Sequence, residues 1–118
     1  MPKVNLAEKF ASFKELWRPK IVADLNGQQV KLVRMKDEFV WHRHEREDEL
    51  FLVAKGKLRI CLRDGDVELA EGELYVVPRG VEHKPVAEQE AQILMFEPAT
   101  TRNTGELDNE RTVEPERI

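Results

Sequence analysis

The sequence predicts an all-β fold, a barrel or sandwich of short strands that follows one short N-terminal helix. Two observations favour this fold. Apolar and polar residues alternate in several short runs, and turn signals rich in Gly, Asn, Asp and Pro separate these runs roughly every 8 to 12 residues. The chain has 118 residues, which is the usual length of one domain and is enough to bury a hydrophobic core.

The first expected element is a helix over residues 6–17. Asn5 is suited to cap its N-terminus, and Glu8, three residues later, completes a capping-box pattern. Pro19 ends the segment, because the residue before a proline disfavours helical backbone. Four apolar residues recur at helical spacing and form one stripe that we expect to pack on the barrel: Leu6, Phe10, Phe13 and Trp17.

Eight strands are expected after the helix. Asn26-Gly27 and Asp64-Gly65 are strong signals for tight hairpin turns. Residues 57–63 alternate most strictly between apolar and charged side chains, as a strand with one buried face does. The expected strands cover residues 20–25, 28–35, 39–44, 48–55, 57–63, 67–69, 74–77 and 91–96.

The chain therefore divides into a helical segment over residues 1–19, a barrel over residues 20–97 and a polar tail over residues 98–118. The composition of the tail suits a disordered segment. The tail also holds a few apolar residues that would allow it to pack on the barrel or on a neighbouring chain, and the sequence leaves both possibilities open: Leu107, Val113 and Ile118.

Composition argues against several classes of partner. Charged residues make up 36% of the chain and the net charge is -4, with both signs interspersed, so no basic stripe indicates nucleic acid. No apolar run approaches the length of a membrane span, and the N-terminus lacks the apolar core of a signal peptide. The single cysteine, Cys61, cannot form an internal disulfide and fits a reducing compartment. We therefore expect a cytoplasmic protein with neither a nucleic-acid nor a membrane partner.

The three histidines of the chain fall in two short stretches, and both stretches are candidates for metal binding. His42 and His44 would lie on the same face of a strand, roughly 7 Å apart at the backbone. Glu49 follows at an odd spacing, so the charged loop between it and His44 must turn to bring its carboxylate to the same side. His83 lies far downstream. Imidazole suits zinc, copper, iron and nickel, and a carboxylate suits manganese and iron.

The spacing of these residues resembles the two sequence motifs of the cupin family. The first motif is His, any residue, His, three or four residues, Glu, six residues, Gly, and the chain supplies His42, His44, Glu49 and Gly56. The second motif is Gly, five residues, Pro, any residue, Gly, two residues, His, and the chain supplies Gly72, Pro78, Gly80 and His83.

The chain departs from the family pattern at two positions that are not metal ligands in the family. Lys36 stands where a glycine usually opens the first motif, and Ala87 stands where an asparagine usually closes the second. The resemblance covers roughly residues 20–97. It implies a double-stranded β-helix, or jelly-roll, cupin barrel, which agrees with the fold class that the strand pattern predicts.

The resemblance also implies that one divalent ion is held by three histidines and one glutamate, at His42, His44, Glu49 and His83. The ion would be Fe, Mn, Ni, Zn or Cu, because the ligand set alone does not choose among them. A six-coordinate ion would keep two open positions, whereas a structural site is closed. The ligand set therefore favours a functional site over a purely structural one.

Three functions fit such a site. The first is a metal-dependent enzyme acting on a small molecule, with an oxygenase as the favoured class. The second is a module that binds a metal or a small molecule without catalysis. The third is a sugar isomerase or epimerase, but metal-free epimerisation usually needs a histidine base, and every histidine is already assigned to the metal. No catalytic residue is assigned, and the small-molecule ligand is not identified.

The strand that follows Glu49 also suggests how the protein associates. If Glu49 points into the barrel, then Leu50, Leu52 and Ala54 point outward and form an apolar row that needs a cover. The N-terminal helix or a second subunit would provide that cover. Because cupins commonly pair through such sheet faces, we expect a homodimer with the helix beside the interface.

Overall fold

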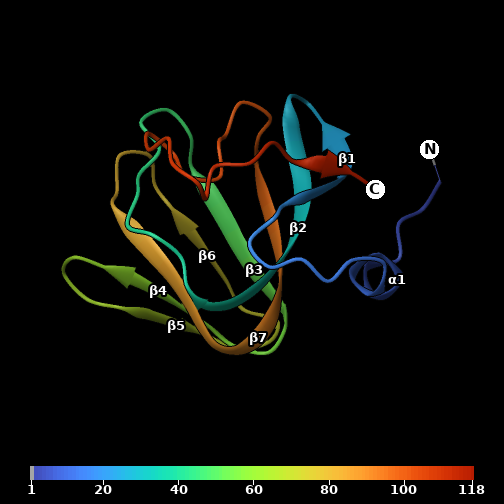
Figure 1. The fold of residues 1–118 in the computed structure, drawn as a ribbon, viewed down its shortest axis with the longest axis horizontal. Helices are drawn as coiled ribbons and strands as arrows, with labels where there is room; N and C mark the ends of the chain where they lie inside the picture. Colours follow the sequence, from blue (N-terminus) through green and yellow to red (C-terminus); the bar gives the residue numbers. More distant parts are fainter. Residues whose placement is uncertain (1) are drawn as a thin grey trace.

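The computed structural model describes residues 2–118 as one short helix followed by strands that wrap into a jelly-roll barrel (Figure 1). Within these residues no helix is long and apolar enough to cross a membrane. The elements are α1 (Leu6–Ala11), β1 (Lys20–Leu25), β2 (Gln28–Glu38), β3 (Glu49–Lys55), β4 (Leu58–Leu62), β5 (Val67–Leu69), β6 (Leu74–Val77), β7 (His83–Pro98) and β8 (Glu116–Arg117).

The 16-residue strand β7 connects the two sides of the barrel. Its first residues pair with β4, its last residues pair with β3, and β2 runs beside most of its length. The strand curves around the lower end of the barrel in Figure 1, so that both of its ends reach the upper end. On one side β5 and β4 extend the sheet, and on the other β6 pairs with β3 and β1 with β2.

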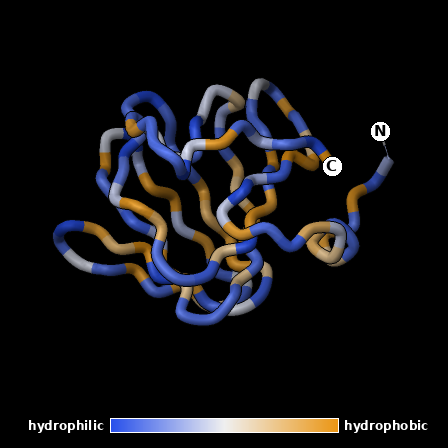
Figure 2. Tube along the Cα trace, viewed as in Figure 1, coloured by the Kyte–Doolittle hydropathy of each residue, from blue (hydrophilic) through white to orange (hydrophobic). Residues whose placement is uncertain are grey.

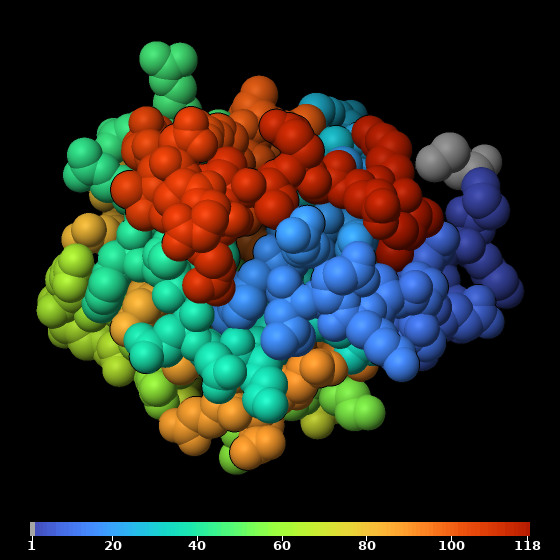
Figure 3. Space-filling view, viewed as in Figure 1, coloured from blue at the N-terminus to red at the C-terminus, as the bar shows by residue number. Residues whose placement is uncertain are grey.

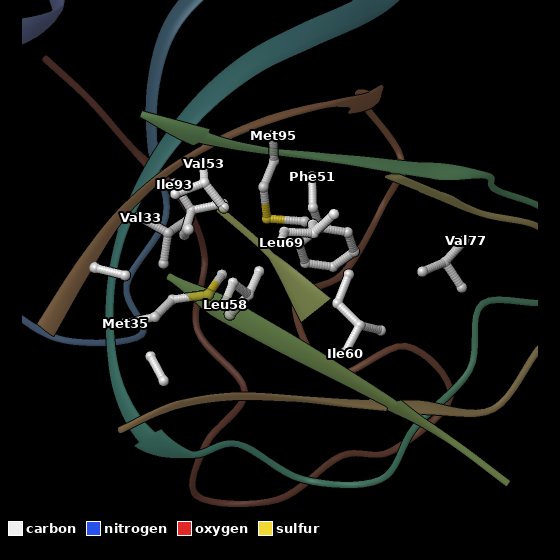
Figure 4. Close-up of a cluster of buried hydrophobic side chains, with 12 residues drawn as sticks. Val33, Met35, Phe51, Val53, Leu58, Ile60, Leu69, Val77, Ile93 and Met95 are labelled. Atoms are coloured by element: carbon white, nitrogen blue, oxygen red, sulfur yellow. The ribbon is translucent and has the colours of Figure 1, made fainter. Parts of the chain in front are cut away.

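The hydrophobic core fills the interior of the barrel between its strands (Figure 4). Strands β2, β3, β4 and β7 alternate, so every second side chain points inward. Figure 2 shows the same alternation as changes between apolar and polar colours along the trace. The largest inward side chains are Val33, Met35, Phe51, Val53, Leu58, Ile60, Ile93 and Met95.

The N-terminal helix is shorter than the sequence predicted, because it ends at Ala11 instead of residue 17. The cause is Arg34, whose guanidinium donates hydrogen bonds to the carbonyls of Phe10 and Phe13 at 2.7 and 2.9 Å. From there the chain runs extended beside β2, and the Trp17 amide donates to the Arg34 carbonyl at 2.8 Å. Asn5 does cap the helix, accepting a hydrogen bond from the Glu8 amide.

The predicted packing of the N-terminal segment on the barrel is confirmed for part of the stripe. Phe10 and Phe13 are buried against Leu32, which faces outward from β2. Leu94 and Ala54 pack beside them from the neighbouring strands. The segment therefore covers one end of the outer face of the sheet.

Two of the predicted strands differ from the structure. Residues 39–44 do not form a strand, because β2 continues to Glu38 and the chain then leaves the sheet, with only one β-bridge between His42 and His83. The last expected strand, residues 91–96, is the second half of β7, which begins at His83.

The C-terminal segment, residues 98–118, folds back over the upper end of the barrel, which decides a question that the sequence left open. Thr101 and Thr104 are buried, and β8 pairs in parallel with β1. The Glu106 amide donates a hydrogen bond to the carbonyl of Arg43, in the loop that carries two of the histidines, at 3.1 Å. In Figure 3 this segment, orange to red, lies across that end beside the blue N-terminal segment.

Gly105 is predicted to be essential for docking this segment. It has φ +61°, and a Cβ atom there would lie 2.1 Å from the Arg43 carbonyl oxygen. Gly72 also has positive φ, +82°, but a Cβ there would meet nothing within 4 Å. Gly105→Ala should therefore lower the free energy of unfolding by about 2–4 kcal/mol and Gly72→Ala by about 1–2 kcal/mol, measured by urea denaturation. Equal losses would show that the contact with Arg43 is not tight.

Candidate metal centre

The four predicted metal ligands come together at the upper end of the barrel. His42 and His44 lie on the extended segment between β2 and β3, Glu49 is the first residue of β3, and His83 is the first residue of β7. Each side chain is at most 5% exposed. One candidate ligand atom from each of the four residues lies within 4.8 Å of all the others. The structure therefore brings together every residue that the sequence assigned to the metal.

Backbone hydrogen bonds fix the segment that carries the two upstream histidines. The amide of His42 donates to the carbonyl of His83 at 3.0 Å, and the amide of His83 donates to the carbonyl of His42 at 2.9 Å. The amide of Gly80 donates to the carbonyl of His44 at 2.7 Å. Gly80 has φ +78°, a conformation that glycine adopts without strain. The downstream turn and the upstream segment therefore hold each other in place.

Hydrogen bonds to backbone carbonyls also decide which ring nitrogens face the centre. Nδ1 of His42 lies 2.8 Å from the carbonyl oxygen of Val40, and Nδ1 of His83 lies 3.0 Å from that of Val81. A carbonyl only accepts, so each Nδ1 carries the proton and each Nε2 keeps a free lone pair. This is how histidines are usually oriented toward a metal.

His44 provides the strongest evidence that the centre is built for an ion. Within residues 2–118 neither of its ring nitrogens has a hydrogen-bond partner, although both are buried. Its Nε2 lies 2.9 Å from Oε1 of Glu49, but outside hydrogen-bonding geometry. A buried polar atom without a partner costs roughly 1–3 kcal/mol. A divalent cation between these groups would remove that cost, so the donor set fits a metal ion.

The electrostatics favour a neutral imidazole beside a charged carboxylate. Burial, followed by the nearby His83, lowers the pKa of His42 from 6.5 to about 4. Burial acts to raise the pKa of Glu49, but the adjacent His44 and His83 side chains outweigh it and hold this pKa well below its usual value. At neutral pH His42 is therefore free to bind a cation, and Glu49 carries a negative charge.

A buried ion pair that the sequence reading missed lies beside the centre. Glu97 is 3% exposed and Lys31 is 2% exposed, and Nζ of Lys31 lies 3.2 Å from Oε1 of Glu97. Burial and the neighbouring Glu49 charge raise the pKa of Glu97 well above its usual value, and Lys31 opposes them. The alternation of the strand could have predicted that Glu97 is buried, because Ile93, Met95 and Glu97 occupy successive inward positions of β7.

A pocket opens from the centre on the side of His42 and Glu49. Its empty space, with the open mouth included, is about 370 Å³. The pocket therefore suits a small ligand. Apart from His42, Glu49, Glu97 and Asn103, its walls are apolar: Trp17, Pro19, Val33, Met35, Phe39, Phe51, Pro85 and Met95.

Comparison with known proteins agrees with this site and fold. The uncharacterized protein YdbB of Bacillus subtilis (strain 168) is 31% identical to this chain. The matched part is 68% of this chain and 66% of the length of YdbB. The crystal structure of a cupin-2 domain protein from Shewanella frigidimarina is 46% identical, with a TM-score of 0.80 over 80% of this chain and 93% of that one.

A more distant structure is similar in fold alone. It is hydroquinone 1,2-dioxygenase in complex with Cd²⁺ and 4-hydroxybenzonitrile, 19% identical, with a TM-score of 0.68 over 80% of this chain and 71% of that one. The family model of the cupin domain matches residues 29–97, which include all four candidate ligands and most of the barrel. The chain therefore belongs to the cupin family.

Proposed function

We propose that this cupin binds one divalent metal ion through His42, His44, Glu49 and His83 and uses it to act on a small molecule in the adjoining pocket. The observation that carries the proposal is the buried, unpartnered imidazole of His44, which faces three other candidate ligands. Buried polar groups almost always have a partner. Here a metal ion is the partner that satisfies all four groups together.

The arrangement favours a reactive ion over a structural one. Four protein ligands leave a six-coordinate ion two further positions, and the pocket meets the centre beside His42 and Glu49. One carboxylate and three neutral imidazoles would leave a divalent ion with a net positive charge. A bound ion of this kind would supply Lewis acidity and, if redox-active, electron transfer. The surrounding side chains would orient the ligand and exclude bulk water.

Within this function we favour an oxygenase, and Fe, Mn, Ni, Zn and Cu all suit the donor set. Oxygenase chemistry at a metal needs few acid–base side chains from the protein, and this pocket offers few. The fold is also one that a dioxygenase uses in complex with Cd²⁺. Metal analysis of untagged protein identifies the ion, and oxygen uptake by iron-loaded protein with candidate ligands tests the enzyme class. Ligand binding without turnover would instead favour the non-catalytic module.

His44→Ala is expected to remove most of the bound metal and leave the barrel folded, because the barrel is held together by apolar side chains buried between its strands. The matched control is Arg43→Ala, since Arg43 is the adjacent residue but its side chain points to solvent. Elemental analysis should give about one ion per chain for the parent and for the control. An unfolded circular dichroism spectrum for His44→Ala, or full metal content, would contradict the proposal.

The metal-free protein should lose stability as the pH falls from 6.5 to 4. In this range an unfolded His42 binds a proton and the folded one does not, because its folded pKa is about 4. The unfolded state then binds more protons, so the free energy of unfolding decreases with falling pH, by about 3 kcal/mol over the range. Chemical denaturation of chelator-treated protein measures it. The parent should lose this stability relative to His42→Gln as the pH falls, and parallel curves would assign the effect to other groups.

We also infer that the protein forms a homodimer through the outer face of the β6-β3-β7 sheet. Leu50 of β3 pairs across the strands with Val76 and Phe96, and Leu52 pairs with Leu74 and Leu94. Leu74 is 55% exposed and Val76 is 43% exposed. The N-terminal segment packs on Leu94 and Ala54 at one end of this face. The rest is an apolar row that a second copy would cover.

Light scattering at micromolar concentration should therefore give the mass of a dimer. Val76→Asp should shift that mass toward a monomer, since it places an unpaired charge in the interface. Leu107→Asp is the control, because Leu107 is 40% exposed on the C-terminal segment, outside this face. A monomeric parent would rule out a stable dimer, and a dimeric Val76→Asp would place the interface elsewhere.

A further inference from the structure

Arg111 packs against two aromatic residues that line the pocket, although it is far from the candidate metal ligands in sequence. Its guanidinium carbon is 4.8 Å from the centre of the Phe39 ring and 5.9 Å from the centre of the Trp17 ring. These two rings stack on each other with centroids 4.9 Å apart, and both line the pocket. The Phe39 ring in turn meets the His42 imidazole edge to face, at 5.4 Å. One aromatic ring therefore separates the guanidinium from a candidate metal ligand.

The C-terminal segment holds Arg111 in this position through its backbone. The side-chain amide of Asn103, which lines the pocket, donates a hydrogen bond to the Arg111 carbonyl at 2.7 Å. The amide of Arg111 donates to Oδ1 of Asn109 at 2.8 Å. The guanidinium makes one long hydrogen bond, 3.4 Å, to the carbonyl of Glu38. Most of its donors therefore remain available.

Arg111 also lacks a counter-ion. Among residues 2–118 no carboxylate oxygen lies within 4.0 Å of its guanidinium nitrogens, whereas Arg63 and Arg79 pair with Glu82 and Asp48 at 2.8 and 3.2 Å. The aromatic rings hold the cation in place without neutralising it. A guanidinium matches a carboxylate in geometry, because it can donate two parallel hydrogen bonds.

We propose that Arg111 selects a small carboxylate for the pocket, as a specificity-determining residue that acts on the ligand of the proposed metal centre. The apolar body of the ligand lies along Phe39 and Trp17, the carboxylate meets the guanidinium, and the opposite end faces the metal. The charges are consistent with an anion. The centre keeps a net positive charge when an ion is bound, and Glu97 is offset by its pairing with Lys31.

The inference rests on the proposed function, and one titration distinguishes a failure of the Arg111 role from a failure of the proposed metal centre. Zinc-loaded protein is titrated by calorimetry with benzoate and with benzamide, which are similar in shape and differ in charge. Benzoate should bind at least about tenfold more tightly to the parent. Arg111→Gln should abolish most of this ratio, and Arg111→Lys should keep part of it, because lysine retains the charge and loses the planar fork. Arg102→Gln, on the same segment, should leave the ratio unchanged.

The outcomes are distinguishable because zinc content and thermal unfolding are measured on every sample. Equal binding of the two compounds by zinc-loaded parent, no binding of benzoate, or a preserved ratio in folded Arg111→Gln would each overturn the role of Arg111 and leave the metal centre standing. A parent that retains no zinc would contradict the proposed function instead. The ratio of the benzoate and benzamide affinities, measured on the metal-free parent and on metal-free Arg111→Gln, would then test the role of the arginine by itself.

Discussion

The candidate metal centre depends on the curvature of β7. This strand pairs with β4 through its first residues and with β3 through its last, so its two ends meet at the same end of the barrel. His83 stands at one end, where its Nε2 lies 3.0 Å from Oε1 of Glu49, and Glu97 stands near the other, where burial and the Glu49 charge raise its pKa. If β7 were straight, it could not join the two sides of the barrel, and these residues would be far apart. The site is therefore a consequence of how the sheet closes.

The polar end of the barrel interior contains a buried charge pair. Lys31 and Glu97 are both buried, and desolvating two charges offsets much of their attraction, so the pair adds little net stability. Removing only one partner would be costly, roughly 3–5 kcal/mol, because the other charge would remain buried alone. The buried charges of these two residues contribute little to stability. They do keep the wall beside Glu49 polar in an otherwise apolar pocket, which suits a binding site.

The strand pattern predicted an all-β barrel or sandwich, and the resemblance to the cupin motifs implied the jelly roll and the four candidate ligands, because both signals are encoded locally. Strand alternation and tight turns depend on neighbouring residues, and the ligands follow fixed spacings within two short stretches. The helix was predicted too long because Arg34, which lies on a different element, takes the carbonyls that would have continued it. Residues 39–44 were assigned to a strand because they alternate, but only His42 forms a β-bridge. Both errors arise from contacts between distant segments.

The same limit explains why the pocket could not be predicted. Its base is the barrel, but part of its wall comes from the two ends of the chain, with Trp17 preceding the first strand and Asn103 following the last long one. Neither residue belongs to a motif, and the polar composition of residues 98–118 suited disorder equally well. Within one family the barrel and the ligands fix where chemistry takes place. The terminal segments, which lie outside the residues that the family model matches, form part of the wall of the pocket beside the candidate ligands. In this chain they place Trp17 and the Arg111 guanidinium beside the pocket, so under the role proposed for Arg111 the selectivity for a ligand would come from residues outside the barrel.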